Sequence, residues 1–392
     1  MSAEAVNQNT SAETPGPNDI RVMLVDDSLV IRGLISRMVK SAPGMYVVAS
    51  VGDGARAIEE VKRRDVDVIV LDIEMPTMDG LTALPEIIKA KPGVKVIMAS
   101  TLTGPNADAS IRALSLGAAD YLAKPTSSAD VSGVGGSDVF RRDLIAKIQA
   151  LGYVARKAAG APTNEALKPA SAPVKSTTAE KPLLYSGSVT LRPAKRWMRR
   201  PAILAVGSST GGPQALMRFF ELLKPTMNVP VVVTQHMPPK FTTTLADHIN
   251  RKTGFPCVEA EDGMALEPNK IALAPGDYHM TIVGTPQAPK VKLNQEPPEN
   301  FCRPAVDPML RSLIPVYGER VLTVILTGMG HDGLHGSEEI IKAGGEVIAQ
   351  DEATSVVWGM PGAVATGGVC STVLPLDEIP HHVTEIITKA MP

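Results

Sequence analysis

Cysteine is scarce in this chain, with three residues in 392: Cys257, Cys302 and Cys370. They lie far apart and are odd in number, so neither a disulfide framework nor a CxxC metal site is expected. We expect buried thiols in a reducing compartment, and therefore a cytoplasmic protein.

Long apolar runs and an excess of one charge are also missing. No run approaches the roughly 18 apolar residues that would suggest a membrane-spanning helix. The first segment, MSAEAVNQNTSAETPGPND (1–19), is polar, so we expect a disordered N-terminus without a signal peptide. The net charge of −2 gives no overall field that would attract nucleic acid or an anionic membrane, so we expect no nucleic-acid partner.

Short apolar segments rich in β-branched residues alternate with segments of helical spacing over residues 20–152. The expected strands are RVMLV (21–25), MYVVASV (45–51), DVIVL (67–71), VKVIMAS (94–100) and ADYLA (119–123). Strands that alternate with helices five times predict a parallel sheet covered by helices on both faces. A last helix is expected over FRRDLIAKIQAL (140–151).

Composition changes after this first domain. Residues 153–200 are dominated by Ala, Pro, Lys, Ser and Thr, which predicts a flexible linker. The end of the linker, RPAKRWMRR (192–200), is either a solvated segment or a docking segment for an acidic partner. A second α/β domain is expected over 201–392. Its expected strands are AILAV (202–206), VPVVVTQ (229–235), KIALA (270–274), VLTVILT (321–327) and EVIA (346–349).

Acidic residues follow two strands of the first domain. Asp26 and Asp27 follow the first strand, and Asp72 ends the third. The carboxyl ends of parallel strands meet at one edge of a sheet, where three carboxylates need a hard cation such as Mg²⁺. Asp72 could then attack a phosphoryl donor, with Lys124 supplying positive charge and Ser100 a hydroxyl. Each residue alone could be a turn former, a helix cap or a solvated side chain.

The complete set, with LDIEMPTMDG around Asp72, closely resembles the receiver domains of two-component response regulators over about residues 20–150. The resemblance implies a flavodoxin-like (βα)5 fold with Asp72 as phosphoacceptor. It implies that Asp26, Asp27 and Asp72 bind Mg²⁺. It also implies a set of switch residues: Ser100, Tyr121 and Lys124.

The second domain opens with AILAVGSSTGGPQAL, a strand running into a glycine-flanked turn and a helix. Such a turn can bind a phosphate on helix amides or expose a nucleophilic serine. Dinucleotide binding needs GxGxxG and an acid about 20 residues later. The glycines Gly207, Gly211 and Gly212 have other spacing, and the next strand ends in Gln235-His236. The nucleophile interpretation is therefore favoured.

A nucleophilic serine needs an imidazole base and a carboxylate that orients it. His236 closes the strand after the Ser208-Ser209 turn, and Asp332 follows the strand VLTVILT. Three strand ends thus bring serine, histidine and aspartate to one edge of the sheet. His279, in a loop after PGD, is the main rival for the base. Any one member could instead be a helix cap, a packed residue or a turn former.

The motifs GSSTGG, TQHMP, PGDYH, LTGMGHDG and QDEATSVVWGMPG together resemble the catalytic domain of chemotaxis protein-glutamate methylesterases, the CheB family, over about residues 200–390. The resemblance implies a doubly wound parallel-sheet domain. It makes Ser209 the nucleophile, His236 the general base and Asp332 its orienting acid. It places the Met329 amide in the oxyanion hole and implies no cofactor for hydrolysis.

The resemblance implies a phosphorylation-activated hydrolase. It would demethylate glutamate methyl esters on methyl-accepting chemotaxis receptors, releasing methanol, and would deamidate specific receptor glutamines. A chemotaxis histidine kinase would donate the phosphoryl group, and the membrane would be reached only through the receptors. The receiver would cover the active site until it is phosphorylated, and Met360-Pro361 would line the cleft.

Three other functions remain open. The receiver could control a binding module without catalysis, or the second domain could hydrolyse a small soluble ester. A DNA-binding response regulator is disfavoured by the near-neutral charge and by the lack of a helix-turn-helix pattern.

Overall fold

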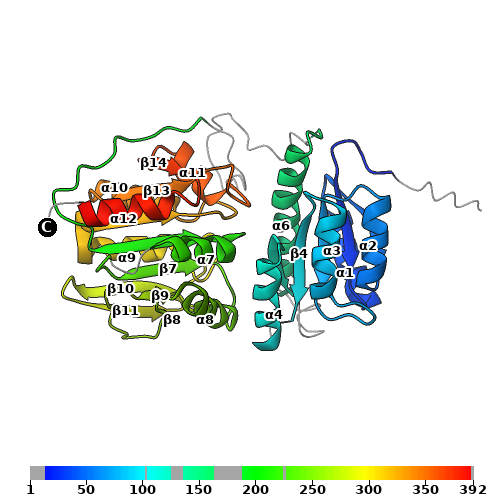
Figure 1. The fold of residues 1–392 in the computed structure, drawn as a ribbon, viewed down its shortest axis with the longest axis horizontal. Helices are drawn as coiled ribbons and strands as arrows, with labels where there is room; N and C mark the ends of the chain where they lie inside the picture. The colour runs from blue at the N-terminus through cyan, green and yellow to red at the C-terminus, as the bar shows by residue number, and fades with distance from the viewer. Residues whose placement is uncertain (1–13, 102–103, 125–135, 163–187, 224–226, 390–392) are drawn as a thin grey trace, which may run out of the picture.

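The structure is a computed structural model that describes residues 14–101, 104–124, 136–162, 188–223 and 227–389. Most of the segment expected to be disordered (1–19) and the centre of the expected linker lie outside the described residues, as do residues 125–135. Two α/β units pack side by side (Figure 1). In the described part of the chain, no helix combines the length and apolarity needed to cross a bilayer.

The first unit is a five-stranded parallel sheet with the strand order β2-β1-β3-β4-β5. Its strands are β1 (Ile20–Val25), β2 (Met45–Val51), β3 (Val68–Asp72), β4 (Lys95–Ser100) and β5 (Asp120–Ala123). Its helices are α1 (Leu29–Lys40), α2 (Gly54–Arg63), α3 (Gly80–Ala90), α4 (Gly104–Ser115) and α6 (Gly136–Ala158). Side chains of Ser28, Asp53 and Asp79 accept hydrogen bonds from first-turn amides of α1, α2 and α3, which fixes where these helices begin. The expected flavodoxin-like fold is confirmed.

The second unit is a seven-stranded parallel sheet with the order β14-β13-β12-β6-β7-β9-β8. Its strands are β6 (Ile203–Ser208), β7 (Val231–Gln235), β8 (Cys257–Glu259), β9 (Ile271–Leu273), β12 (Val321–Ile325), β13 (Glu346–Gln350) and β14 (Thr372–Leu374). Its helices are α7 (Gly212–Leu222), α8 (Phe241–Thr253), α9 (Val306–Tyr317), α10 (Leu334–Lys342), α11 (Met360–Thr366) and α12 (Ile379–Lys389). The expected doubly wound parallel sheet is confirmed.

Several elements were not expected from the sequence. The hairpin β10 (His279–Thr285) and β11 (Ala288–Asn294) forms a separate two-stranded sheet. Strands β8 and β14 have three residues each, too few to give a periodic pattern.

The expected linker differs from the structure at both ends. Helix α6 runs to Ala158, so the boundary expected at residue 152 falls inside a helix. Residues 188–200 follow the surface of the second unit: the Thr190 amide donates to the Ala365 carbonyl, and Trp197 Nε1 donates to Glu346 Oε2 at 2.7 Å. Part of the basic segment 192–200 therefore binds its own chain.

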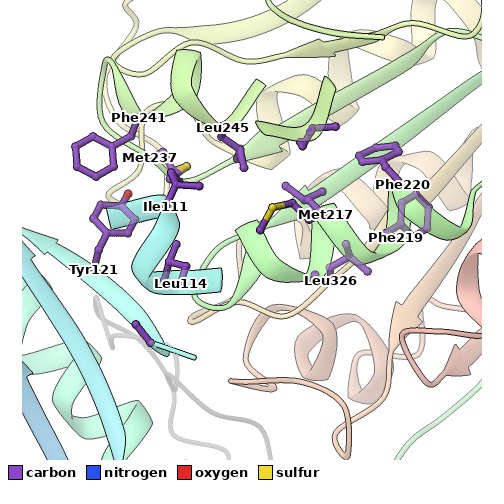
Figure 2. Packing of buried hydrophobic residues seen from close by; sticks show 14 of the residues in the cluster. Ile111, Leu114, Tyr121, Met217, Phe219, Phe220, Met237, Phe241, Leu245 and Leu326 are labelled. Atoms are coloured by element: carbon purple, nitrogen blue, oxygen red, sulfur yellow. The ribbon is translucent and has the colours of Figure 1, made fainter. Parts of the chain in front are cut away.

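A continuous apolar cluster joins the two units (Figure 2). Tyr121 of β5 stacks on Phe241 of α8, with the ring centroids 4.8 Å apart. Around this pair, Ile111 and Leu114 of α4 face residues of α7 and α8. These side chains are buried, so the face formed by α4 and β5 is covered by the second unit.

Candidate functional site

The edge of the first sheet gathers the three acids predicted from the sequence. Carboxylate oxygens of Asp26, Asp27 and Asp72 lie within 4.8 Å of one another. Lys124, directly after β5, places Nζ 2.6 Å from Asp26 Oδ2 and 2.6 Å from Asp72 Oδ1. The fold therefore brings the expected acids and the expected lysine into one acidic cluster.

The cluster of Asp26, Asp27 and Asp72 favours binding of a cation. Burial raises the pKa of Asp72 to about 6, and the charge of Asp26 adds to the rise, while Lys124 opposes it. A group of three carboxylates beside a single ammonium retains excess negative charge. Oxygen donors of this kind suit a hard divalent ion such as Mg²⁺, so Asp26, Asp27 and Asp72 fit the metal expected from the sequence.

The other expected switch residues, Ser100 and Tyr121, have partners outside this acidic cluster. Ser100 ends β4, is buried, and its Oγ lies 2.9 Å from Ser110 Oγ of α4. Tyr121 is buried against Phe241 of the second unit. Thus Tyr121 of β5 lies at the contact between the units, and Lys124, directly after the same strand, lies at the acidic cluster.

The second sheet places Ser208 and Ser209 at the end of β6. Ser208 is fully buried and its Oγ donates to Gln235 Oε1 at 2.7 Å, so it is a structural residue. Ser209 is half-buried and lies just before the turn. Gly211 has a φ of +76°, a left-handed conformation that favours glycine, and it allows the chain to turn sharply into α7. This turn is what leaves Ser209 at the edge of the sheet.

The predicted pair His236 and Asp332 is formed. His236 follows β7, and its Nε2 lies 2.7 Å from Asp332 Oδ2. Asp332 is buried and lies at the N-terminus of α9, where it accepts hydrogen bonds from the amides of Val306 at 2.6 Å and Asp307 at 3.1 Å. Helix amides and the helix dipole stabilise an anion at this place.

The electrostatics of the pair favour an ionised Asp332 and the charged form of His236 in this docked form. Burial opposes ionisation of Asp332, but its hydrogen bond to His236 and the helix amides hold the pKa of Asp332 below its usual value. Burial also opposes the charged form of His236, yet Cys302 and Asp332 outweigh it and raise the pKa of His236 well above its usual value. Because the Asp332 carboxylate only accepts, Nε2 keeps its proton, and Nδ1 is the nitrogen that gains or loses a proton.

Two other histidines, the rival His279 and His248, have other partners. His279 is buried in β10, where its Nδ1 accepts from the Ala305 amide and its Nε2 lies 3.2 Å from the Pro297 carbonyl. Both ring nitrogens therefore serve the structure. His248 of α8 places Nε2 2.9 Å from Asp108 Oδ1 of α4, a contact between the two units.

Met329 lies two residues after Thr327, whose carbonyl accepts the Ser209 amide. Within the described residues, the Met329 amide donates no hydrogen bond to the protein. Met360 and Pro361, expected to lie in a segment that lines the cleft, are buried in α11. The Met360 amide donates to the carbonyl of Gly328, the residue before Met329, at 2.8 Å, so this segment lies beside the turn that carries Met329.

Sequence reasoning missed Asn300, Cys302 and Asp307. Asn300 Nδ2 donates to Asp332 Oδ1 and to Asp307 Oδ2, at 2.9 Å in each case. Cys302 Sγ lies 3.3 Å from His236 Nδ1. Burial raises the pKa of Asp307 to about 7, and the charge of Asp332 adds to the rise. These residues follow no expected strand; they lie in the segment NFCRPAVD (300–307).

The first unit contacts residues next to this site. Thr210, after Ser209, donates its Oγ1 proton to Asp120 Oδ2 at 2.7 Å. Met237, after His236, belongs to the apolar cluster around Tyr121 (Figure 2). Met329 packs against a core cluster that contains residues of α6. The receiver-like unit therefore covers the surroundings of the serine and the histidine.

Comparisons with known proteins agree with this architecture. The response regulator receiver domain family matches residues 22–133, and the CheB methylesterase family matches residues 204–383. The protein-glutamate methylesterase/protein-glutamine glutaminase 1 of Paramagnetospirillum magneticum is 51% identical over 96% of this chain and 98% of its own length. Its namesake from Azospirillum brasilense is 51% identical over 96% of this chain and 94% of its own length.

A solved structure, the CheB methylesterase catalytic domain of Thermotoga maritima, is 38% identical and covers 48% of this chain and 99% of that chain, with a TM-score of 0.46. The extent and identity of the curated relatives decide the assignment, since they span both units and the segment between them. The chain belongs to the protein-glutamate methylesterase/protein-glutamine glutaminase family, with an N-terminal receiver domain and a C-terminal CheB methylesterase domain.

Proposed function

We propose that this chain removes methyl esters from glutamates of methyl-accepting chemotaxis receptors and deamidates specific receptor glutamines, using Ser209, His236 and Asp332. The observation that carries the proposal is the convergence of these residues at one sheet edge, with His236 Nε2 2.7 Å from Asp332 Oδ2. The names of the relatives supply the substrate class.

The chemistry follows from the roles of the three side chains. Nδ1 of His236 takes the Ser209 proton as Oγ attacks the side-chain carbonyl of the methylated glutamate. The oxyanion is stabilised by the Met329 amide, a contribution of about 3 kcal/mol for a well-placed donor. His236 then protonates the leaving methanol, or ammonia when the substrate is glutamine. Water, activated by the same nitrogen, cleaves the acyl-enzyme and restores glutamate and Ser209.

Asp332 supports each of these proton transfers. Its carboxylate accepts a hydrogen bond from Nε2–H, fixes the imidazole tautomer and stabilises the imidazolium formed after attack. The amides of α9 hold the carboxylate in place and keep it ionised. The hydrolysis therefore needs no metal or organic cofactor in this scheme.

The receiver controls access to this chemistry. Asp72 accepts a phosphoryl group from a histidine kinase; Asp26, Asp27 and Asp72 would hold Mg²⁺, which offsets the negative charge of the incoming phosphoryl group. Lys124 and Ser100 then turn toward the phosphoryl oxygens. Movement of β5 and α4 would loosen the contact of Tyr121 with Phe241 and uncover the serine. A kinase donor and three free thiols are consistent with the expected cytoplasmic location.

A trapping experiment tests the nucleophile. Full-length protein would be reacted with a fluorophosphonate after activation by a small phosphodonor and Mg²⁺, and the modified residue located by mass spectrometry. Ser209 should carry the label, and Ser209→Ala should abolish both labelling and methanol release from methylated receptor membranes. Ser208→Ala is the matched control and should keep most of the activity. Undiminished methanol release by Ser209→Ala would contradict the proposed nucleophile.

A further inference from the structure

The turn Glu299–Cys302 touches both His236 and Asp332. Within it, the Asn300 amide group donates to Asp332 Oδ1 at 2.9 Å, and Cys302 Sγ lies 3.3 Å from His236 Nδ1. Ser209 is the other candidate partner of Nδ1. Among the described residues, its Oγ forms no hydrogen bond. In this receiver-docked form, the basic nitrogen of His236 therefore faces a thiol.

Nδ1 of His236 has room for one partner in the ring plane, and Cys302 Sγ occupies that position. In the neutral imidazole the thiol donates to Nδ1, and in the imidazolium Nδ1–H donates to the sulfur. In both states the contact opposes transfer of the serine proton to Nδ1. Since sulfur forms only weak hydrogen bonds, a small displacement of Cys302 would let the serine hydroxyl take its place.

The backbone of the turn has an unfavourable conformation. Two hydrogen bonds close it, from the Glu299 amide to the Cys302 carbonyl at 3.1 Å and from the Cys302 amide to the Glu299 carbonyl at 2.9 Å. Asn300 and Phe301 at its centre have φ values of +53° and +63°. This left-handed conformation is unfavourable for a phenylalanine and persists only when surrounding contacts hold it.

The receiver supplies one of these contacts. The guanidinium carbon of Arg142, on α6, lies 4.2 Å from the centroid of the Phe301 ring, although that side chain is 66% exposed. The second contact comes from α9, where Arg311 binds both carboxylate oxygens of Glu299 at 2.7 and 2.5 Å. One end of the turn is thus fixed to the catalytic domain, and its tip to the receiver.

We propose that the turn Glu299–Cys302 couples receiver docking to the catalytic base: in the docked form it keeps Nδ1 of His236 on Cys302, and undocking frees that nitrogen for Ser209. This inference rests on the proposed triad. Cys302 is here a positioning residue that restrains the base, while Asn300 keeps Asp332 in place throughout. Inhibition then has a second component besides coverage of the site.

Rates of methanol release by the full-length protein, with and without a phosphodonor, distinguish restraint of His236 by Cys302 from a purely structural role of Cys302. Cys302→Ala should raise the unstimulated rate about fivefold, the equivalent of one net hydrogen bond of about 1 kcal/mol, and leave the stimulated rate within about twofold of wild type. Cys302→Ser keeps a donor and should hold the unstimulated rate near wild type. Cys257→Ala, in β8, is the matched control and should leave the ratio of the two rates unchanged.

The ¹⁵N resonance of His236 Nδ1, assigned with His236→Gln, gives an independent readout. It should move in wild type when beryllofluoride and Mg²⁺ mimic phosphorylation, and should start near its activated position in Cys302→Ala. An unmoved wild-type resonance, or equal loss of both rates in Cys302→Ala, would overturn the proposal. Persistent release in Ser209→Ala would instead refute the proposed nucleophile, while the resonance would still decide the role of Cys302.

Discussion

At the edge of the first sheet, Asp72 is buried beside another carboxylate, and its pKa rises to about 6. At the edge of the second sheet, Asp332 is buried more deeply, yet its pKa is held below the usual value. The difference is in the donors: Asp332 accepts from helix amides and an imidazole, whereas Lys124 is the main cationic partner of Asp72. The same side chain is thereby prepared for two tasks. Asp72 is stabilised by an incoming cation, while Asp332 is a permanent anion.

The largest expected effect is on the rate of methanol release when the anion of Asp332 is removed. Asp332→Asn keeps the size of the side chain but no longer fixes the proton on Nε2, so the rate of methanol release should fall by about 10³-fold or more. Asp307→Asn, one hydrogen bond further from the imidazole, should cost no more than about tenfold. Similar losses in the two variants would mean that Asp332 has no special relation to His236.

A smaller effect is expected where the two regions meet. Tyr121→Ala removes the ring stacked on Phe241, and such pairs contribute on the order of 1 kcal/mol beyond their buried area. The unstimulated rate should rise about tenfold as the receiver undocks more often, while the stimulated rate changes little. Tyr46→Ala on β2, at the opposite edge of the first sheet, is the control. A fall in the unstimulated rate of Tyr121→Ala would show that docking supports catalysis.

The smallest expected effect concerns stability and pH. The pKa of Asp307 is raised to about 7 in the folded state, so the folded protein binds more protons than the unfolded chain between about pH 4 and 7. Its contribution to the free energy of unfolding therefore falls as pH rises through this window. Asp307→Asn cannot ionise, so the stability of the variant relative to wild type should improve between pH 5 and 8, by on the order of 2 kcal/mol.

Urea unfolding at several pH values measures this difference. The slope with pH is the informative quantity, because the substitution also changes hydrogen bonds to Asn300 and Gly336 at every pH. A difference that stays constant from pH 5 to pH 8 would mean that Asp307 is ionised throughout and shares no proton with its surroundings.

The two regions also differ in how far the sequence predicts them. In the receiver, Asp26 and Asp27 directly follow β1, Asp72 ends β3 and Lys124 directly follows β5, so strand order alone brings them together. For the second domain, the same logic predicted the contact between His236 and Asp332. It could not predict Asn300 or Cys302, because a turn with left-handed residues has no periodicity, and its position depends on tertiary contacts.

The helix α6 extends past the boundary expected at residue 152 for a related reason. The composition after residue 152 predicts a linker, but alanine also favours a helix, and α6 continues to Ala158. Arg156 in this extension is buried and its Nη1 lies 3.2 Å from Asp67 Oδ2. Composition alone cannot distinguish such a helix from a linker until a tertiary partner is known.

The central claim is that phosphorylation at the first sheet edge controls a serine hydrolase at the second. The most direct test is methanol release from methyl-labelled receptor membranes by wild type, Asp72→Ala and Ser209→Ala, each with and without a small phosphodonor and Mg²⁺. The account predicts stimulation of wild type, an unstimulated rate without response in Asp72→Ala, and no release in Ser209→Ala. Stimulation that survives in Asp72→Ala would contradict it.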